Sequence, residues 1–375
     1  WPGLTPAATT PPTGQPHADP ATATAGPHRR AEVVAAFVAA AGGHTTAGYC
    51  SVDTRCAAFV NSAGRMVADV TTTAAFDGIV RASAGTAAPA DGLARAASSR
   101  LADLDGAALG AVARTKALAA RNPVDLPPGR YQVLLEPTAV ADLIDVMAVY
   151  GFSGRALAER CSFVELGAAQ FDRAVTLVDD PAAAATAGWC FDAEGGVRER
   201  IELVRAGVTH AVANDRRTAA RLGTASNGRA VPGAGWWGPI PINLAMLPAP
   251  QPGPATGPAP DGAGPVADGS VAALVAGVDH GLLVTDNWYT RVLDPRTLVV
   301  TGLTRNGVWL IENGEVTRPV ANLRFTQAYP AALGPGAVLG VGGRAVSFAA
   351  AGSEFRSAVP ALHLAGWNYT GGAAG

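Results

Sequence analysis

The sequence is poor in charge, and above all in lysine. Charged residues make up 15% of its 375 residues, Lys116 is the only lysine, and the formal net charge is −2. A chain with so little net charge has no global field that would attract nucleic acid or an anionic membrane surface. We therefore expect neither kind of partner. The same composition, with hydrophobic residues at 49%, fits an alanine-rich coding bias better than a large shared interface.

Long apolar runs and paired cysteines are also missing. No apolar run reaches the roughly 18 residues that a membrane-spanning helix needs, and Trp1–Leu4 resembles no signal peptide. The cysteines match no Cys-x-x-Cys pair and no zinc-site spacing; they are Cys50, Cys56, Cys161 and Cys190. A chain of this length needs no disulfides, so we expect reduced, mostly buried thiols and a cytoplasmic location.

Histidine is scarce where a catalytic metal site would need it. None occurs between His44 and His210. His280 follows Asp279 and could act as a base, but a lone histidine at a strand entry is usually structural. The same holds for His210 and His363, and a metal site built from these three histidines is disfavoured.

Composition divides the chain into segments. Residues 1–27 are rich in Pro, Ala and Thr and are expected to form a linker or exposed loop. Residues 28–124 are expected to form an α/β domain, and residues 125–375 a β-rich domain. A Pro- and Gly-rich stretch at 248–268 is expected to be a flexible insert in the second domain. Because the sequence starts without Met, we expect the first domain to be incomplete.

Periodicity predicts the elements of these segments. Helices are expected over Ala31–Val38, Leu93–Leu104, Gly106–Ala120 and Thr138–Tyr150, the third capped by Asp105. Strands are expected over Thr45–Val52, Cys56–Val60, Met66–Val70, Tyr131–Leu135 and Arg198–Val204, with a turn at Asn61–Gly64.

Two cysteines and a pair of tryptophans each allow two interpretations. Cys161 and Cys190 could be nucleophiles, yet neither has a neighbouring His or Asn, which favours inert thiols. The pair Trp236-Trp237 suits an interface anchor and core packing equally well.

Several short motifs occur together in the second half of the chain. They are Phe191–Gly195, Asp215–Gly223, Ser226–Gly228, Asp286–Pro295, Leu303–Gly307 and Ile311–Gly314. In combination they resemble the TldD/PmbA (TldD–TldE) family of zinc metallopeptidase subunits. The resemblance implies an α+β fold, with an N-terminal α/β domain followed by curved antiparallel and mixed sheets.

The metal-binding motif of that family has a different composition here. Active subunits carry His-Glu-x-x-x-His on a helix, in which two imidazoles bind zinc and the carboxylate takes a proton from the metal-bound water. Overlaid on this motif, the chain has Asp145 at the first His, Val146 at the Glu and Tyr150 at the second His. A valine moves no proton, and a tyrosine with a pKa near about 10 is a poor zinc ligand. The family's third ligand, a cysteine near the C-terminus, also has no counterpart after Cys190.

The resemblance therefore implies a TldE-like subunit with no catalytic, cofactor-binding or metal-binding residues of its own. Zinc is expected in a TldD-type partner of a heterodimer that cleaves short, unfolded or modified peptides. Two alternatives stay open: a self-sufficient hydrolase with an unrecognised site near Asp279-His280 or Cys161, and a homo-oligomeric peptide-binding protein.

Overall fold

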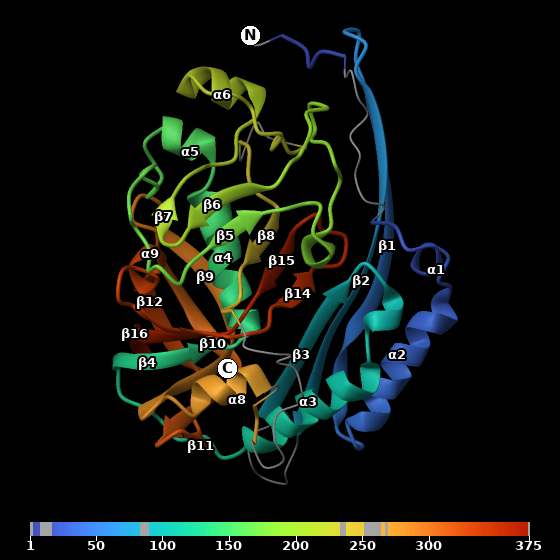
Figure 1. Ribbon diagram of the computed structural model, residues 1–375. Coiled ribbons are helices and arrows are strands. Elements are labelled where there is room, and N and C mark those ends of the chain that lie inside the picture. The colour runs from blue at the N-terminus through green and yellow to red at the C-terminus, as the bar shows by residue number, and fades with distance from the viewer. Residues whose placement is uncertain are drawn as a thin grey trace.

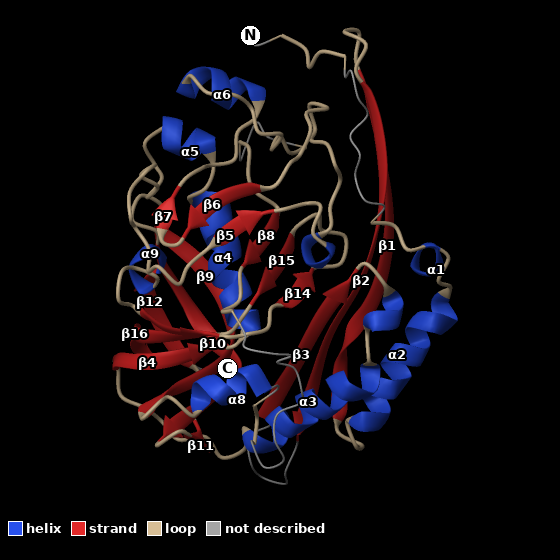
Figure 2. Cartoon of the chain, viewed as in Figure 1, coloured by secondary structure: helices blue, strands red, loops and turns tan. Residues whose placement is uncertain are grey.

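The structure is a computed structural model that describes residues 3–7, 17–82, 90–232, 238–250, 264–266 and 269–373. Within these ranges the strands form three sheets, with helices on and between them, so that the fold is α+β as predicted (Figures 1 and 2). The pair Trp236-Trp237 and most of the 248–268 insert lie outside the described residues.

The first sheet is a three-stranded antiparallel sheet in the order β1-β2-β3, with two helices on one face (Figure 1). Its elements are α1 (Pro20–Ala23), α2 (Pro27–Ala40), β1 (Thr45–Val60), β2 (Met66–Ala82), β3 (Ala90–Ser98), η1 (Leu101–Asp103) and α3 (Gly106–Ala119). As predicted, the Asp105 side chain caps α3, accepting a hydrogen bond from the Ala108 backbone N–H.

Two sequence predictions for this part are wrong. The expected helix over Leu93–Leu104 is instead strand β3 followed by the short η1. Alanine favours helix, but pairing with β2 overrides that weak preference. In addition, β3 can lie against α3 because Gly92 has no side chain: a Cβ there would come within 2.0 Å of the Ala113 carbonyl oxygen. The two strands expected before Asn61 are one continuous strand. The expectation of a linker or exposed loop over residues 1–27 stays a prediction; its described part includes the four-residue helix α1.

The second sheet closes on itself. Hydrogen bonds join β10 to β12, β12 to β16, β16 to β4, β4 to β9, and β9 back to β10. Its strands are β4 (Gly129–Leu135), β9 (His280–Asp294), β10 (Val299–Glu312), β11 (Glu315–Pro319), β12 (Leu323–Ala328), β13 (Val338–Val341) and β16 (Leu362–Gly372). Short helices α8 (Gly269–Val275) and α9 (Tyr329–Ala332) accompany it. The result is a small barrel-like sheet with no open edge along this ring.

The third sheet runs in the order β14-β15-β8-β5-β6-β7. Its strands are β5 (Leu177–Asp179), β6 (Ile201–Arg205), β7 (Val208–Thr209), β8 (Asn243–Met246), β14 (Val346–Ala349) and β15 (Arg356–Val359). Near it lie α4 (Pro137–Tyr150), α5 (Gly154–Ala158), η2 (Ala184–Thr186) and α6 (Arg216–Leu222).

Helix α4 is the central element of the molecule. It begins with Pro137 in the first turn, where the missing N–H costs nothing, and it lies between the closed sheet and the third sheet (Figure 1). Leu143, Ile144 and Met147 are fully buried in the largest core cluster. At its N-cap, the buried Glu136 carboxylate accepts a hydrogen bond from Lys116 Nζ of α3 at 2.5 Å. The only lysine of the chain therefore ties α4 to the first layer.

Within the part of the chain that the structure describes, none of the helices has both the length and the apolar character needed to cross a lipid bilayer.

Candidate functional site

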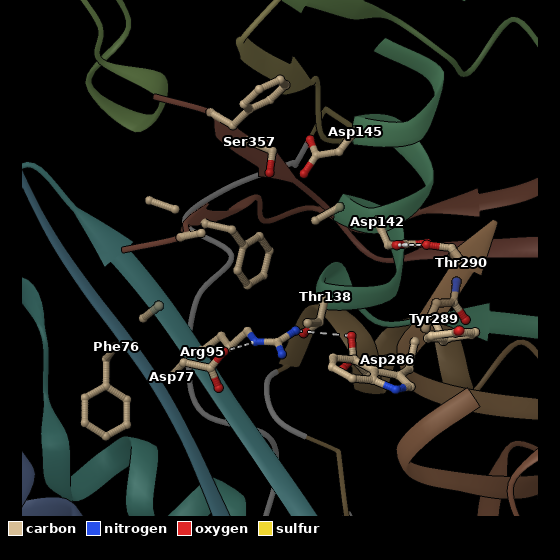
Figure 3. Close-up of a pocket in the computed structure, with 18 of the residues that line it drawn as sticks. Phe76, Asp77, Arg95, Thr138, Asp142, Asp145, Asp286, Tyr289, Thr290 and Ser357 are labelled. Atoms are coloured by element: carbon tan, nitrogen blue, oxygen red, sulfur yellow. Dashed lines mark hydrogen bonds and ion pairs between the residues drawn. The ribbon is translucent and has the colours of Figure 1, made fainter. Parts of the chain in front are cut away.

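A cavity of about 600 Å³ lies where the first sheet, α4, β9 and the β14–β15 hairpin meet (Figure 3). A volume of this size is typical of ligand-binding pockets, which measure about 300–1,000 Å³. Charged and aromatic side chains from all four elements line it; they are Tyr49, Phe76, Asp77, Arg95, Asp142, Asp145, Asp286, Trp288, Tyr289, Arg291, Phe348 and Phe355.

One face of α4 forms a wall of this cavity. Thr138, Ala141, Asp142 and Asp145 all line it. Residues three, four and seven positions apart lie on the same face of an α-helix. An otherwise apolar helix thus carries one polar stripe, and that stripe faces the cavity.

The Asp142 carboxylate is held on both sides. Its Oδ1 accepts a hydrogen bond from Thr290 Oγ1 at 2.9 Å (Figure 3). Its Oδ2 accepts one from the hydroxyl of the buried Tyr329 at 3.2 Å. Burial raises the pKa of Asp142 to about 7, although both hydrogen bonds oppose the shift. This side chain therefore exchanges its proton near neutral pH.

The Asp145 carboxylate lies one turn further along, beside Ser357 of β15 (Figure 3). Burial, aided by the nearby charge of Asp142, raises the pKa of Asp145 to about 7, while hydrogen bonding by the Ser357 hydroxyl opposes the shift. Its Oδ1 is inaccessible to solvent and has no hydrogen-bond partner among the described residues. The two aspartates interact, so they titrate as a pair.

An ion network crosses the cavity from the first sheet to β9. Arg95 Nε of β3 donates to Asp77 Oδ2 at 2.6 Å, and its Nη1 donates to Asp286 Oδ1 at 3.2 Å. Asn306 Nδ2 donates to the other Asp286 oxygen at 3.1 Å. Burial raises the pKa of Asp286, while the Arg95 charge and the Asn306 hydrogen bond oppose that shift. The network fixes the first sheet against the closed sheet at the cavity floor.

Two β-bulges in the β9–β10 pair account for particular residue types in the sequence motifs of these strands. Between Arg305 and Val308, β10 carries one residue more than β9. Asn306 there has a φ of 59° and Gly307 a φ of 127°, and a Cβ on Gly307 would lie 2.0 Å from the Trp309 ring. Asparagine and glycine tolerate such backbone. The bulge brings the Asn306 side chain to Asp286.

The second bulge lies in β9 between Trp288 and Arg291, where Tyr289 has a φ of 55°. A bulky residue in this region is strained and commonly marks a functional position. Because a bulge redirects side chains, the consecutive Trp288 and Tyr289 both line the cavity while remaining partly exposed. The Arg305 guanidinium lies 4.5 Å from the Trp288 ring centroid, and that of Arg291 lies 4.2 Å from the Tyr289 ring centroid.

The three positions overlaid on the metal motif do not share a face of α4. Only Asp145 lines the cavity, whereas Val146 and Tyr150 pack against the main core. Residues one and five positions apart differ by about 100° and 140° around a regular helix, and α4 is regular from Pro137 to Tyr150.

The donor set of the cavity does not fit a zinc site. It offers carboxylates but no imidazole or thiolate, and zinc sites in proteins are built mainly from those two. Among the residues that the structure describes, no group of three or more His, Cys, Asp or Glu side chains is arranged to hold a metal ion.

The histidines singled out in the sequence lie outside the cavity. His210 and His280 are exposed. His363 lies in β16, where its Nε2 is 3.3 Å from Gln132 Oε1 and burial lowers its pKa. It is therefore a neutral, hydrogen-bonded residue of the sheet.

The cysteines also lie apart from the cavity. Cys56 is exposed and the other three are half-buried, so the prediction of mostly buried thiols is wrong. Cys50 and Cys56 lie on β1, a strand without fully buried side chains. The Cys161 thiol faces the Ala156 carbonyl oxygen at 3.5 Å. Burial raises the pKa of the Cys190 thiol to about 12, so this thiol is protonated at neutral pH.

Sequence reasoning overlooked much of this cavity. Asp142 and Thr138 went unnoticed, although their spacing with Asp145 on an apolar helix was a readable signal. Asp77 and Arg95 carried no such signal. They reach the cavity through strand pairing between segments distant in sequence, Arg95 from a segment predicted to be helical.

Comparison with known proteins places this arrangement in a known class. Residues 128–365 match the PmbA/TldA metallopeptidase C-terminal domain. The match spans more than half of the chain, which therefore belongs to the PmbA/TldD metallopeptidase family. No curated protein is detectably similar to it in sequence.

Solved structures from three organisms have the same fold. TldE from Thermococcus kodakarensis is 18% identical, with a TM-score of 0.82 over 99% of this chain and 80% of the other. A candidate modulator of DNA gyrase from Thermotoga maritima is 16% identical, with a TM-score of 0.82 over 98% and 80%. A second such protein, from Bacteroides thetaiotaomicron, is 20% identical, with a TM-score of 0.75 over 95% and 74%. At these identities the likeness establishes the fold.

Proposed function

We propose that this chain is the non-catalytic, TldE-type subunit of a two-subunit zinc metallopeptidase that acts on short, unfolded or modified peptides. A TldD-type partner supplies the zinc and the catalytic base, and the complex works in the cytoplasm. Residues 28–124 and 125–375 form the two domains of the subunit.

One observation carries the proposal. Where the family's active subunits have two imidazoles and a carboxylate, this chain has Asp145, Val146 and Tyr150, and only the first faces the cavity. Without a proton-accepting group at the second position, a metal-bound water has no base to activate it. The likeness to the fold of TldE from Thermococcus kodakarensis supports the same assignment.

The cavity gives such a subunit a physical task. Its volume accommodates an extended segment but no folded domain. Its wall includes β3 and β14, which are edge strands of their sheets, and edge strands can hold an extended peptide through backbone hydrogen bonds. The chain would therefore shape the chamber and retain the peptide while the partner cleaves it.

The test is reconstitution with a co-expressed TldD-type subunit. Zinc is counted per subunit, and cleavage of unstructured peptides is measured for each chain alone and for the mixture. We expect a stable complex, zinc only in the partner, and cleavage only when both chains are present. The control is a complex whose partner carries Gln in place of the motif Glu, which should assemble normally and cleave nothing.

Other results would replace the proposal. One tightly held zinc per isolated chain, or cleavage by the isolated chain, would indicate a self-sufficient hydrolase. Mutation of Asp279, His280 and Cys161 would then locate its site. Homo-oligomers that bind peptides but no TldD-type subunit would indicate a peptide-binding protein.

A further inference from the structure

Two polar atoms at the cavity lack hydrogen-bond partners among the described residues. Asn287 lines the cavity with only 6% of its surface exposed, and its Nδ2 donates to no group. Asp145 Oδ1, on the α4 wall, accepts from none. Buried polar groups are nearly always paired, and leaving them unpaired costs stability. A donor and an acceptor that both lack partners at one cavity indicate a ligand carrying the complementary pair.

The charges lining the cavity indicate the sign of that ligand. Arg95 is occupied by Asp77 and Asp286. Arg291 lies over the Tyr289 ring and donates to the Thr290 carbonyl oxygen.

Asp142 receives hydrogen bonds only from two hydroxyl groups, and no salt bridge reaches either Asp142 or Asp145 within the described residues. Neither carboxylate on this helix face therefore has a protein cation in direct contact, although the Arg95 charge acts on Asp142 from beyond salt-bridge distance. A ligand cation would supply the direct contact.

Aromatic rings line the same cavity. Trp288 and Tyr289 come from the β9 bulge, and Phe348 and Phe355 come from the β14–β15 hairpin. Ring faces attract ammonium groups and pack against the apolar stem that carries them. This combination suits an amine attached to an apolar chain better than a hydrated metal ion.

We infer that the cavity binds a primary ammonium group of an extended peptide, with Asp145 and Asp142 receiving the ammonium and Asn287 Nδ2 donating to a neighbouring peptide carbonyl oxygen. The ammonium belongs to the peptide N-terminus or to a lysine side chain, which present the same chemistry. The inference rests on the proposed function in that the bound peptide is taken to be a substrate of the complex.

Calorimetric titration of the isolated chain tests the inference directly. The probes are an unstructured pentapeptide amide with a free N-terminus, its N-acetylated form, and an N-acetylated form with one central lysine. We expect the free amine or the lysine form to bind at least about tenfold more tightly than the acetylated, lysine-free form. The form that binds more tightly identifies the source of the ammonium. Equal affinity for all three, or no binding of any, would overturn the inference.

Variants locate the bound group. Asp145→Asn should weaken binding of the preferred amine by about tenfold, while Asp125→Asn, an exposed aspartate outside the cavity, should leave it unchanged. Asn287→Ala should weaken binding of all peptides alike, because it removes a contact with the backbone. Circular dichroism checks that each variant is folded, and the acetylation comparison on the wild-type chain does not depend on any variant. Unchanged binding in a folded Asp145→Asn variant would place the ammonium elsewhere and overturn the inference.

The two proposals can fail separately. If the complex cleaves peptides but the isolated chain ignores acetylation, this inference is wrong and the proposed function stands. If the isolated chain selects free amines but forms no active complex, the proposed function is wrong and the amine site stands.

Discussion

Two groups of buried charged side chains differ in whether each charge has a partner in direct contact. Beside the third sheet, Asp179 of β5 and Arg229 of the segment after α6 are both fully buried, and the Arg229 Nε donates to Asp179 Oδ2 at 2.7 Å. The other Asp179 oxygen accepts from the Asn243 backbone N–H at 3.1 Å, and Arg198 lies 3.9 Å from it. At the cavity, Asp142 and Asp145 have no cation beside them.

This difference distinguishes charges that stabilise the fold from charges that are available to bind a ligand. A buried ion pair whose partners are both in place holds strands together and leaves nothing for a ligand. Carboxylates at a cavity without a cation destabilise the free protein and gain most from a bound one. Variants that remove a charge from each group in turn test this difference.

The largest effect is expected in the third sheet. Arg229→Met leaves the fully buried Asp179 without its main partner, which should lower the free energy of unfolding by about 3–5 kcal/mol. Urea denaturation measures it. The matched control is Arg221→Met, whose guanidinium is exposed, and there the change should stay within about 0.5 kcal/mol. If Arg229→Met lowers the free energy of unfolding no more than the control does, the pair has no structural role.

Removing the arginine of the cavity network should cost less. Arg95→Met leaves the buried Asp286 with Asn306 as its remaining partner, and we expect a loss of about 1–3 kcal/mol. It should also strengthen binding of an amine, because Asp77 and Asp286 then add uncompensated negative charge. Denaturation and calorimetric titration of the same variant check both effects, and weaker amine binding would contradict the second.

The aspartate pair should make stability depend on pH. The pKa of Asp142 and of Asp145 is raised to about 7 in the folded chain from an ordinary 3.8. The folded state therefore retains protons that the unfolded state has lost. This contribution is fully present below about pH 4 and is lost as the pH rises to 7.

The Asp145→Asn variant no longer has the part of this pH-dependent loss of stability that comes from Asp145. The variant should be more stable than the wild type by roughly 1–2 kcal/mol at pH 8, and the difference should shrink towards pH 4. Asp286, Arg95, Thr290 and Tyr329 also act on Asp142, and Ser357 acts on Asp145, so the difference between variant and wild type, measured by denaturation at each pH, isolates Asp145. The Asp125→Asn control should show the same dependence of stability on pH as the wild type. A difference between Asp145→Asn and the wild type that does not change with pH would show that Asp145 does not cause this dependence.

The smallest effect is expected at the β9 bulge. Tyr289→Gly relieves a positive φ that tyrosine adopts at a cost, and since Tyr289 is 62% exposed little burial is lost. We expect the free energy of unfolding, measured by thermal denaturation, to rise by up to about 1 kcal/mol. Trp288→Gly, at the neighbouring extended position, should destabilise the chain. Destabilisation at both positions would show that the Tyr289 backbone is not strained.

Several elements of the fold could be predicted because their signals are local. The strand at 131–135, the helix at 138–150 and the cap at Asp105 follow from periodicity and capping chemistry over a few residues. The strand at 90–98 could not, since its small residues suit a helix equally well and only pairing with β2 decides between the two.

The cavity shows the same division. The Asp286–Pro295 motif marked the right part of the chain, but only the tertiary structure shows that the β-bulges of β9 and β10 place Asn306 beside Asp286.

By itself the sequence determined the family and the residue types at the metal-motif positions, because these depend on identity and spacing along the chain. The tertiary structure alone decided that Asp77 and Arg95 meet Asp286 and that Asp142 and Asp145 have no cation beside them. Those relations depend on distances between segments that the folded chain brings together, and both the free energy of a charge and its pKa are set by such distances and by burial.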